Sequence, residues 1–143
     1  DVELFSHAGA DLISFHIEAE INPIDRIKQI KKNNIKVGVA IKPSTSIDSV
    51  TDFIDDIDLI LIMTVEPGLG GQKFLDSQLS KIYEIRNLIS KKSLNTDIEV
   101  DGGINKQTGK MCVDAGANIL VAGTYIFDKS INNYKERINS LRY

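Results

Sequence analysis

The sequence predicts an α/β fold built on a parallel sheet, because short apolar segments alternate with segments of helical spacing. Five such strand candidates begin at intervals of roughly 20 to 40 residues, which is the length of a βα unit. One helix-to-strand corner occurs twice, as Ala8-Gly9-Ala10-Asp11 and as Ala115-Gly116-Ala117-Asn118. Alternation of this kind fits either a doubly wound sheet or a barrel.

The composition is that of one globular domain covering residues 1–143. Of these residues 42% are hydrophobic and 26% are charged, and the net charge is −3. The chain has no basic block of the kind that nucleic acid or an anionic membrane surface would favour. It also lacks an apolar run of the ~18 residues that a membrane span needs. Cys112 is the only cysteine, which excludes an intrachain disulfide and favours a reducing, cytoplasmic location.

The order of the elements follows from their apolar spacing and their end signals. Val2, Leu4 and Phe5 are available for the buried face of a first helix, which Gly9 ends. Strands are predicted at residues 12–18, 36–41, 59–65, 98–101 and 119–122, the third apolar enough to be buried on both faces. Helices are predicted at residues 23–33, 47–54, 77–90, 106–115 and 132–141, with Asn22-Pro23 and Asn105 as start signals.

One of these strands ends in a carboxylate. In Ile98-Glu99-Val100-Asp101-Gly102-Gly103-Ile104 an apolar run ends at Asp101, and two glycines then let the backbone turn sharply. The carboxyl ends of parallel strands carry the chemistry of α/β enzymes, because the βα loops meet there. Asp101 is therefore a candidate catalytic residue, and a solvated Asp-Gly turn is the alternative.

Three glycine turns follow successive strands of the predicted sheet. They are Gly68-Leu69-Gly70-Gly71, Gly102-Gly103 and Gly123-Thr124. The first lacks the Gly-Lys-Ser/Thr ending of a P-loop and the third glycine of a dinucleotide fingerprint. Each turn alone reads as an ordinary tight turn. Together they predict a site that binds phosphate through backbone N–H groups, as at the last strands of a TIM barrel.

Several of these segments resemble the ribulose-phosphate 3-epimerase family. The longest is LIMTVEPGLGGQKF at residues 61–74, followed by EVDGGI at 99–104 and VAGT at 121–124. SFHIEA at residues 14–19 and GVAIKP at 38–43 continue the similarity, so that it covers essentially the whole chain. The resemblance implies a TIM (β/α)8 barrel whose fourth to eighth strands are present. It also implies that the first three βα units are not part of this sequence.

The resemblance further implies a site. In the family two His and two Asp side chains hold a divalent metal (Zn, Fe, Mn or Co), and only Asp101 occupies one of those positions here. Asp101 would also be one of two acid/base carboxylates. Met63 would border the enediolate intermediate, with a plain core methionine as the alternative. His16 would border the pocket, although a hydrogen-bonded barrel histidine is the more common role. The phosphate would be bound by Gly68, Leu69, Gly70, Gly71, Gly102, Gly103, Gly123 and Thr124.

The implied function is isomerase activity on a pentulose phosphate. It interconverts D-ribulose 5-phosphate and D-xylulose 5-phosphate at C3, a reaction of the pentose phosphate pathway. A homo-oligomer is expected. The alternatives are a hexulose-6-phosphate 3-epimerase, another sugar-phosphate barrel enzyme, or an inactive phosphate-binding barrel fragment. The 143-residue chain alone is expected to be inactive and to bind metal poorly, because one carboxylate cannot hold a divalent ion.

Overall fold

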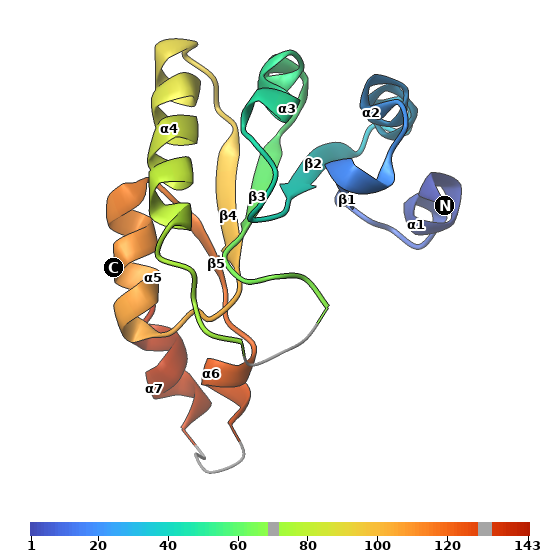
Figure 1. Ribbon diagram of the computed structural model, residues 1–143. Helices are drawn as coiled ribbons and strands as arrows, with labels where there is room; N and C mark the ends of the chain where they lie inside the picture. The colour runs from blue at the N-terminus through green and yellow to red at the C-terminus, as the bar shows by residue number, and fades with distance from the viewer. Residues whose placement is uncertain (69–71, 129–132) are drawn as a thin grey trace.

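A five-stranded parallel sheet organises the structure, a computed structural model that describes residues 1–68, 72–128 and 133–143 (Figure 1). Along the sheet the strands follow the order of the chain, and every neighbouring pair is parallel. The strands are β1 (Leu12–His16), β2 (Lys36–Ile41), β3 (Leu59–Met63), β4 (Asp97–Asp101) and β5 (Ile119–Val121). The alternation predicted from the sequence is confirmed.

The strand order decides between the two windings that the sequence left open. A doubly wound sheet reverses its strand order at a switch point, which places helices on both faces. Here the order runs β1-β2-β3-β4-β5 without reversal. Because βα crossovers are right-handed, an unreversed order places successive helices on the same face of the sheet. Figure 1 shows the helices along the outer side of a curved sheet, which is the arrangement of a barrel wall.

The predicted helices and strands are present but several differ in extent. The helices are α1 (Val2–His7), α2 (Pro23–Lys31), α3 (Asp48–Thr51), α4 (Gln78–Lys91), α5 (Lys106–Ala115), α6 (Thr124–Phe127) and α7 (Tyr134–Asn139), with 3-10 turns η1 (Ile17–Ala19) and η2 (Ile54–Asp56). Strand β3, for example, ends at Met63 rather than at residue 65, and α2 ends at Lys31 rather than at residue 33. The helix expected at 47–54 is divided into α3 and η2. The strand expected at 12–18 ends at His16, and η1 follows. Residues 124–127, where no helix was predicted, form α6, and α7 is shorter than the predicted helix at 132–141, of which residue 132 is not described.

Capping residues set the start of two helices that lead away from the strand ends. The Asn22 side chain accepts from Asp25 N before α2, and Pro23 occupies the first turn. Before α5 the Asn105 side chain accepts from Gln107 N and Thr108 N, while the Thr108 hydroxyl accepts from Asn105 N, forming a capping box. The backbone after Asp101 is thereby turned at once into α5.

The core lies between the sheet and the helices. One face of the strands carries branched side chains that are fully buried, namely Val37, Val39, Ile41, Ile60, Ile62, Ile98 and Val100. Opposite them α4 contributes Ile82, Ile85 and Ile89 at helical spacing. The first helix departs from expectation: Val2 is buried, but Leu4 and Phe5 are 64% and 54% exposed. Their expected burial is wrong, because Val2 alone reaches the core cluster from α1.

The other face of the sheet is more polar, and the register of the strands determines which residues project from it. Ser14 pairs with Gly38, and Gly38 pairs with Leu59. At the carboxyl ends Met63 pairs with Asp101, and Asp101 pairs with Val121. Paired residues of parallel strands share a face, so Met63 and Asp101 project to the same side of the sheet, away from the helix-covered core.

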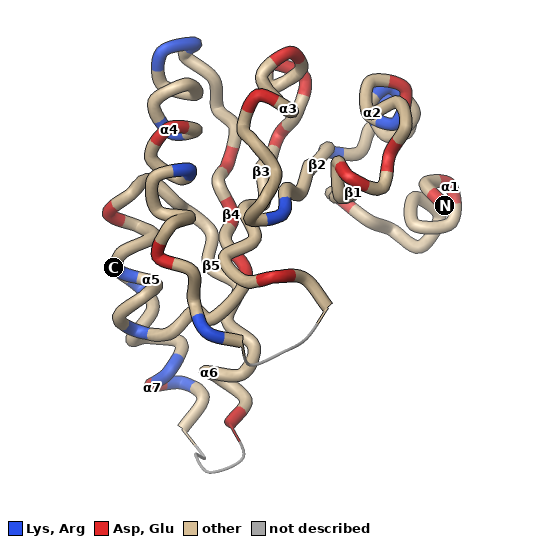
Figure 2. Tube along the Cα trace, viewed as in Figure 1, with Lys and Arg blue, Asp and Glu red and all other residues tan. Residues whose placement is uncertain are grey.

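No helix within the described ranges combines the length and the apolar character that a bilayer crossing would require. Charged residues of both signs are distributed over the helices and loops, as Figure 2 shows.

Candidate functional site

A cleft of about 850 Å³ opens at the carboxyl ends of β3, β4 and β5. Its lining includes all the described residues that the sequence nominated at these strand ends: Met63, Gly68, Asp101, Gly102, Gly103, Gly123 and Thr124. Leu69, Gly70 and Gly71 were nominated with them and lie outside the described residues. Segments from three parts of the chain therefore meet around one cavity, as the strand-end argument requires.

Asp101 stands at the end of β4, beside Met63 of β3. Met63 is 7% exposed, so its thioether forms a packed apolar side of the cleft. Burial raises the pKa of the Asp101 carboxyl above its ordinary value. A carboxylate with a raised pKa is a stronger base, because its pKa lies closer to neutral pH. The position combines an apolar wall with a carboxylate able to accept a proton.

A second carboxylate, Glu99, shares this strand and this face. It lies two residues before Asp101 and pairs with Leu61 and Ile119 on the neighbouring strands. Burial, and after it the negative charge of Asp101, raises the pKa of Glu99. Glu99 is not among the residues that line the cleft. Glu99 and Asp101 therefore project from the same face of β4, and of the two it is Asp101, nearer the carboxyl end of the strand, that lines the cleft.

The loop after Asp101 is held by a buried threonine that the sequence analysis did not single out. Thr64 donates its N–H to Asp101 O at 2.9 Å and its hydroxyl to Gly102 O at 2.6 Å. Thr64 O in turn accepts from Leu75 N at 2.9 Å. The Thr108 hydroxyl donates to Gly103 O at 2.9 Å. Thr64, which directly follows β3, therefore fixes the backbone of both Asp101 and Gly102.

Gly102 and Gly103 are required by this packing. Both have positive φ, +124° and +66°. A Cβ on Gly102 would lie 2.8 Å from Val65 N, and one on Gly103 would lie 2.7 Å from Phe74 N. Distances under 3.0 Å are sterically forbidden for a methyl group. The pair thus brings two loops into direct backbone contact at the cleft.

Gly123 and Gly68 differ from that pair. Gly123 has φ −82°, and an added Cβ would meet no atom within 4 Å. Gly68 has φ +117° and equally open surroundings. Gly123 lines the cleft, and the position that its Cβ would take is open. Thr124 follows as the first residue of α6 and is exposed at the same mouth.

His16 does not line the cleft at the ends of β3, β4 and β5. It ends β1 and pairs with Ala40. Its Nδ1 is 3.3 Å from Glu18 Oε2, and both side chains are partly exposed. The described contact is that of a hydrogen-bonded strand-end histidine.

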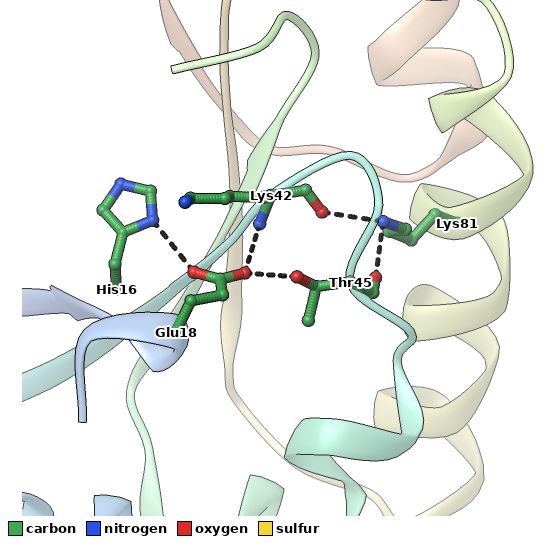
Figure 3. Close-up of polar contacts among 5 residues, drawn as sticks. All are labelled: His16, Glu18, Lys42, Thr45 and Lys81. Carbon is green, nitrogen blue, oxygen red and sulfur yellow. Dashed lines mark hydrogen bonds and ion pairs between the residues drawn. The ribbon is translucent and has the colours of Figure 1, made fainter. Parts of the chain in front are cut away.

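Glu18 belongs to a polar cluster that sequence inspection missed (Figure 3). Its Oε1 accepts from Lys42 N at 2.8 Å and from the Thr45 hydroxyl. From the other side Lys81 of α4 donates to Lys42 O at 3.1 Å, to Pro43 O at 2.8 Å and to Thr45 O at 2.8 Å. An ammonium has three donors, and all three are used. The loop at residues 42–45, which leaves the carboxyl end of β2, is therefore clamped between an acid and a base.

The pKa values of the two clamping groups reflect these contacts. Burial acts to raise the pKa of the Glu18 carboxyl, but the hydrogen bonds from Lys42 N–H and the Thr45 hydroxyl outweigh it and hold the pKa below its ordinary value. Burial lowers the pKa of the Lys81 ammonium, and the charges of Glu18 and Glu66 oppose that change. Glu66 also lines the cleft, so Lys81 links the clamp electrostatically to the site.

Replacing Glu18 with Gln is expected to cost stability in a pH-dependent way. A carboxyl whose pKa is lowered by folding contributes stability above its unfolded pKa of about 4, and that contribution is lost as the pH falls through the folded value. The difference in unfolding free energy between wild type and E18Q, from urea titrations, should be largest near pH 7 and should shrink in acid. Glu84→Gln, on the exposed side of α4, is the control. An equal difference at pH 7 and pH 3 would contradict the assignment.

The resemblance to the epimerase family implies a bound metal ion, for which this chain supplies one expected ligand, Asp101. Among the described residues no group of three or more His, Cys, Asp or Glu side chains is placed to hold a metal ion. Asp101 could supply one ligand, whereas stable sites for Zn²⁺, Fe²⁺ or Mn²⁺ use several. The residues described here do not form a complete metal site.

Comparison with known proteins agrees with the motifs. A model of the "Ribulose-phosphate 3 epimerase family" matches residues 1–127. The ribulose-phosphate 3-epimerase of Bacillus subtilis (strain 168) is 42% identical over 142 residues, which are 99% of this chain and 64% of that protein. That of Chlamydia trachomatis is 44% identical over 139 residues, covering 96% of this chain and 60% of that protein. The chain thus spans less than two thirds of the length of these curated relatives.

A solved structure agrees with the fold. The crystal structure of a 3-hexulose-6-phosphate synthase superposes with a TM-score of 0.72 at 20% identity, covering 99% of this chain and 65% of that one. Fold and cleft together define a segment of an α/β barrel that carries its site at the carboxyl ends of the strands. The chain belongs to the ribulose-phosphate 3-epimerase family.

Proposed function

We propose that the whole protein interconverts D-ribulose 5-phosphate and D-xylulose 5-phosphate by epimerisation at C3. The observation that carries the proposal is the placement of Asp101 beside Met63 in a cleft that three glycine-containing loops also line. Family membership, through relatives that bear the name ribulose-phosphate 3-epimerase, supports the same substrate class.

The reaction needs a proton acceptor on one face of C3 and a proton donor on the other. Asp101 takes or returns one of these protons at its carboxylate oxygen. Removal of the C3 proton leaves its electron pair in an enediolate across C2 and C3, and a proton delivered to the opposite face gives the epimer. The second carboxylate comes from the part of the whole protein outside these residues. The packed side chain of Met63 keeps water away from the plane of the intermediate.

A divalent cation, of the Zn, Fe, Mn or Co type, is proposed as the cofactor of the whole protein, with Asp101 as its one ligand from this chain. Such a cation would stabilise the negative charge that develops on the enediolate oxygens. The raised pKa of Asp101 describes the carboxyl without a neighbouring cation, whose charge would favour the ionised form.

The phosphate is proposed to occupy the part of the cleft lined by Gly102, Gly103, Gly123 and Thr124. Backbone N–H groups at close-approach glycines suit an anion, since no side chain screens them. The open space in front of Gly123 supports this placement. Gly68, Leu69, Gly70 and Gly71 are proposed to contribute from the loop after β3.

The test is turnover of D-ribulose 5-phosphate by the whole protein in D2O, followed by NMR. The expected result is conversion to D-xylulose 5-phosphate with one solvent deuterium at C3, because the proton passes through exchangeable carboxyl groups. Hexulose 6-phosphates serve as the comparison and should react more slowly. Faster turnover of a hexulose 6-phosphate would replace the proposal by an epimerase of that class. No exchange on either substrate would favour a non-catalytic phosphate-binding protein.

Two further expectations stay predictions. They are a homo-oligomeric whole protein and a cytoplasmic location. A pentulose phosphate is the proposed partner, with no nucleic acid or membrane partner.

A further inference from the structure

An arginine from the last helix lies at the end of the cleft that holds the third glycine turn. Arg137 of α7 lines the cavity together with Gly123 and Thr124. It follows the residues that match the family model, which end at 127. In Figure 1 α6 and α7 lie side by side beyond β5, and the two helices are in contact. Neither the sequence motifs nor the family match therefore points to this side chain.

The Arg137 side chain is held in place by Tyr125. Its Nη1 donates to Tyr125 O at 3.1 Å, and its Cζ lies 4.4 Å from the centre of the Tyr125 ring. The Tyr125 hydroxyl and Ser140 Oγ are 2.9 Å apart, and Ser140 Oγ donates to Arg137 O at 2.7 Å. A guanidinium stacked on an aromatic ring and bonded to a carbonyl loses little further freedom when it binds a ligand.

Most of the donors of this guanidinium remain available. Arginine carries five N–H donors in a planar fork. Within the described part of the chain, Arg137 has a hydrogen bond to one acceptor, Tyr125 O. The side chain is half-buried and is one of the residues that line the cavity. A planar fork with free donors is suited to a phosphate or carboxylate group.

The charged side chains around the cleft indicate why a phosphate ligand would require the Arg137 guanidinium. The described lining contains four carboxylates, Glu66, Asp76, Asp101 and Asp128, against two cations, Lys73 and Arg137. A phosphate dianion that enters such a cavity is repelled by the acids, and backbone N–H groups carry no formal charge to offset that repulsion. Arg137 is the cation beside the Gly123-Thr124 turn.

We propose that Arg137 is a binding residue that selects the phosphorylated substrate, contacting the phosphate with donors that Tyr125 does not use. The inference rests on the proposed function for the identity of the ligand as a sugar phosphate. It adds a charged side chain to a site that the motifs describe as made of backbone groups.

The test uses Arg137→Gln, Arg137→Lys and the matched control Lys135→Gln, an exposed cation on the same helix. Calorimetry measures inorganic phosphate binding to the whole protein, and steady-state kinetics measure KM and kcat for ribulose 5-phosphate. R137Q should weaken phosphate binding and raise KM by about ten-fold, the size of one charge-assisted hydrogen bond, with kcat within about two-fold. R137K should recover most of the loss, and K135Q should match wild type.

Three outcomes would overturn the inference. The first is unchanged phosphate binding in folded R137Q. The second is an equal loss in R137K and R137Q, since that would assign the effect to the lost Tyr125 contact rather than to charge. The third comes from NMR of the wild-type protein, in which the guanidinium signal of Arg137 is assigned by its absence in R137K. This signal should shift when phosphate is added. No shift at saturating phosphate would contradict a contact between Arg137 and phosphate. Arginine-dependent phosphate binding without epimerisation would instead reject the proposed function and leave this inference standing.

Discussion

Replacing Asp101 with Asn should reduce kcat of the whole protein by about three orders of magnitude or more, the scale of a lost general base. The amide keeps the shape of the carboxyl but cannot accept the proton of C3. Stability should not fall, because burial disfavours the charged carboxylate that the substitution removes. The measurements are epimerase kinetics and thermal unfolding of the same preparation.

Glu99→Gln is the matched control for this experiment. It removes a carboxylate from the same strand and the same face, one level away from the cleft. Its kcat should stay within a few fold of wild type. The assignment of Asp101 would be wrong if D101N kept more than about a tenth of wild-type activity, a loss under ~1.4 kcal/mol. In the wild type, kcat/KM should fall as the pH drops through the Asp101 pKa, since the protonated acid is no base.

The glycine turns should respond in two different ways to an added side chain. Gly123→Val should raise KM for ribulose 5-phosphate by about ten-fold or more at nearly unchanged kcat and Tm, because its side chain enters open cleft space at an ordinary φ. Gly103→Ala should instead destabilise the protein by about 1–3 kcal/mol, because φ is +66° and the Cβ meets the Phe74 backbone. Only the first variant reports on ligand binding.

Gly123→Ala supplies the graded control between glycine and valine. The rise in KM should follow side-chain size, while urea unfolding of both Gly123 variants should match wild type. An unchanged KM in folded Gly123→Val would remove this turn from the phosphate site. Wild-type stability of Gly103→Ala would contradict the backbone contact with Phe74.

The periodic elements could be predicted because their signals are local. Residues 36–41 and 106–115 coincide with β2 and α5, where a bounded apolar run and a capping asparagine with a terminal glycine define the ends. The helix expected at 47–54 is interrupted instead. Val50 and Ile54 are both fully buried, and the Phe53 backbone, at φ −130°, ψ 15°, leaves the helical region between them. Branched residues and aspartates favour helix weakly, so packing decides here.

The site was predictable where a motif lies at a strand end, and not where contacts join distant segments. Asp101, Met63 and the described glycines all reach the cleft from positions that the strand pattern assigns. The contact between Glu18 and Thr45 spans 27 residues, and that between Lys81 and Thr45 spans 36. Arg137 comes from a separate helix with no motif. In a sequence such residues look like ordinary surface charges.

The contact between Gly103 and the loop before α4 restricts how this site can change in evolution. A clash with a side chain can be relieved by a second, smaller substitution at the neighbouring position. At Gly103, however, two of the three nearest atoms to an added Cβ are the N and Cα of Phe74. Every amino acid has those atoms, so no replacement at position 74 makes room. Position 103 is therefore restricted by the path of the chain, and variation of the cleft must come from other residues.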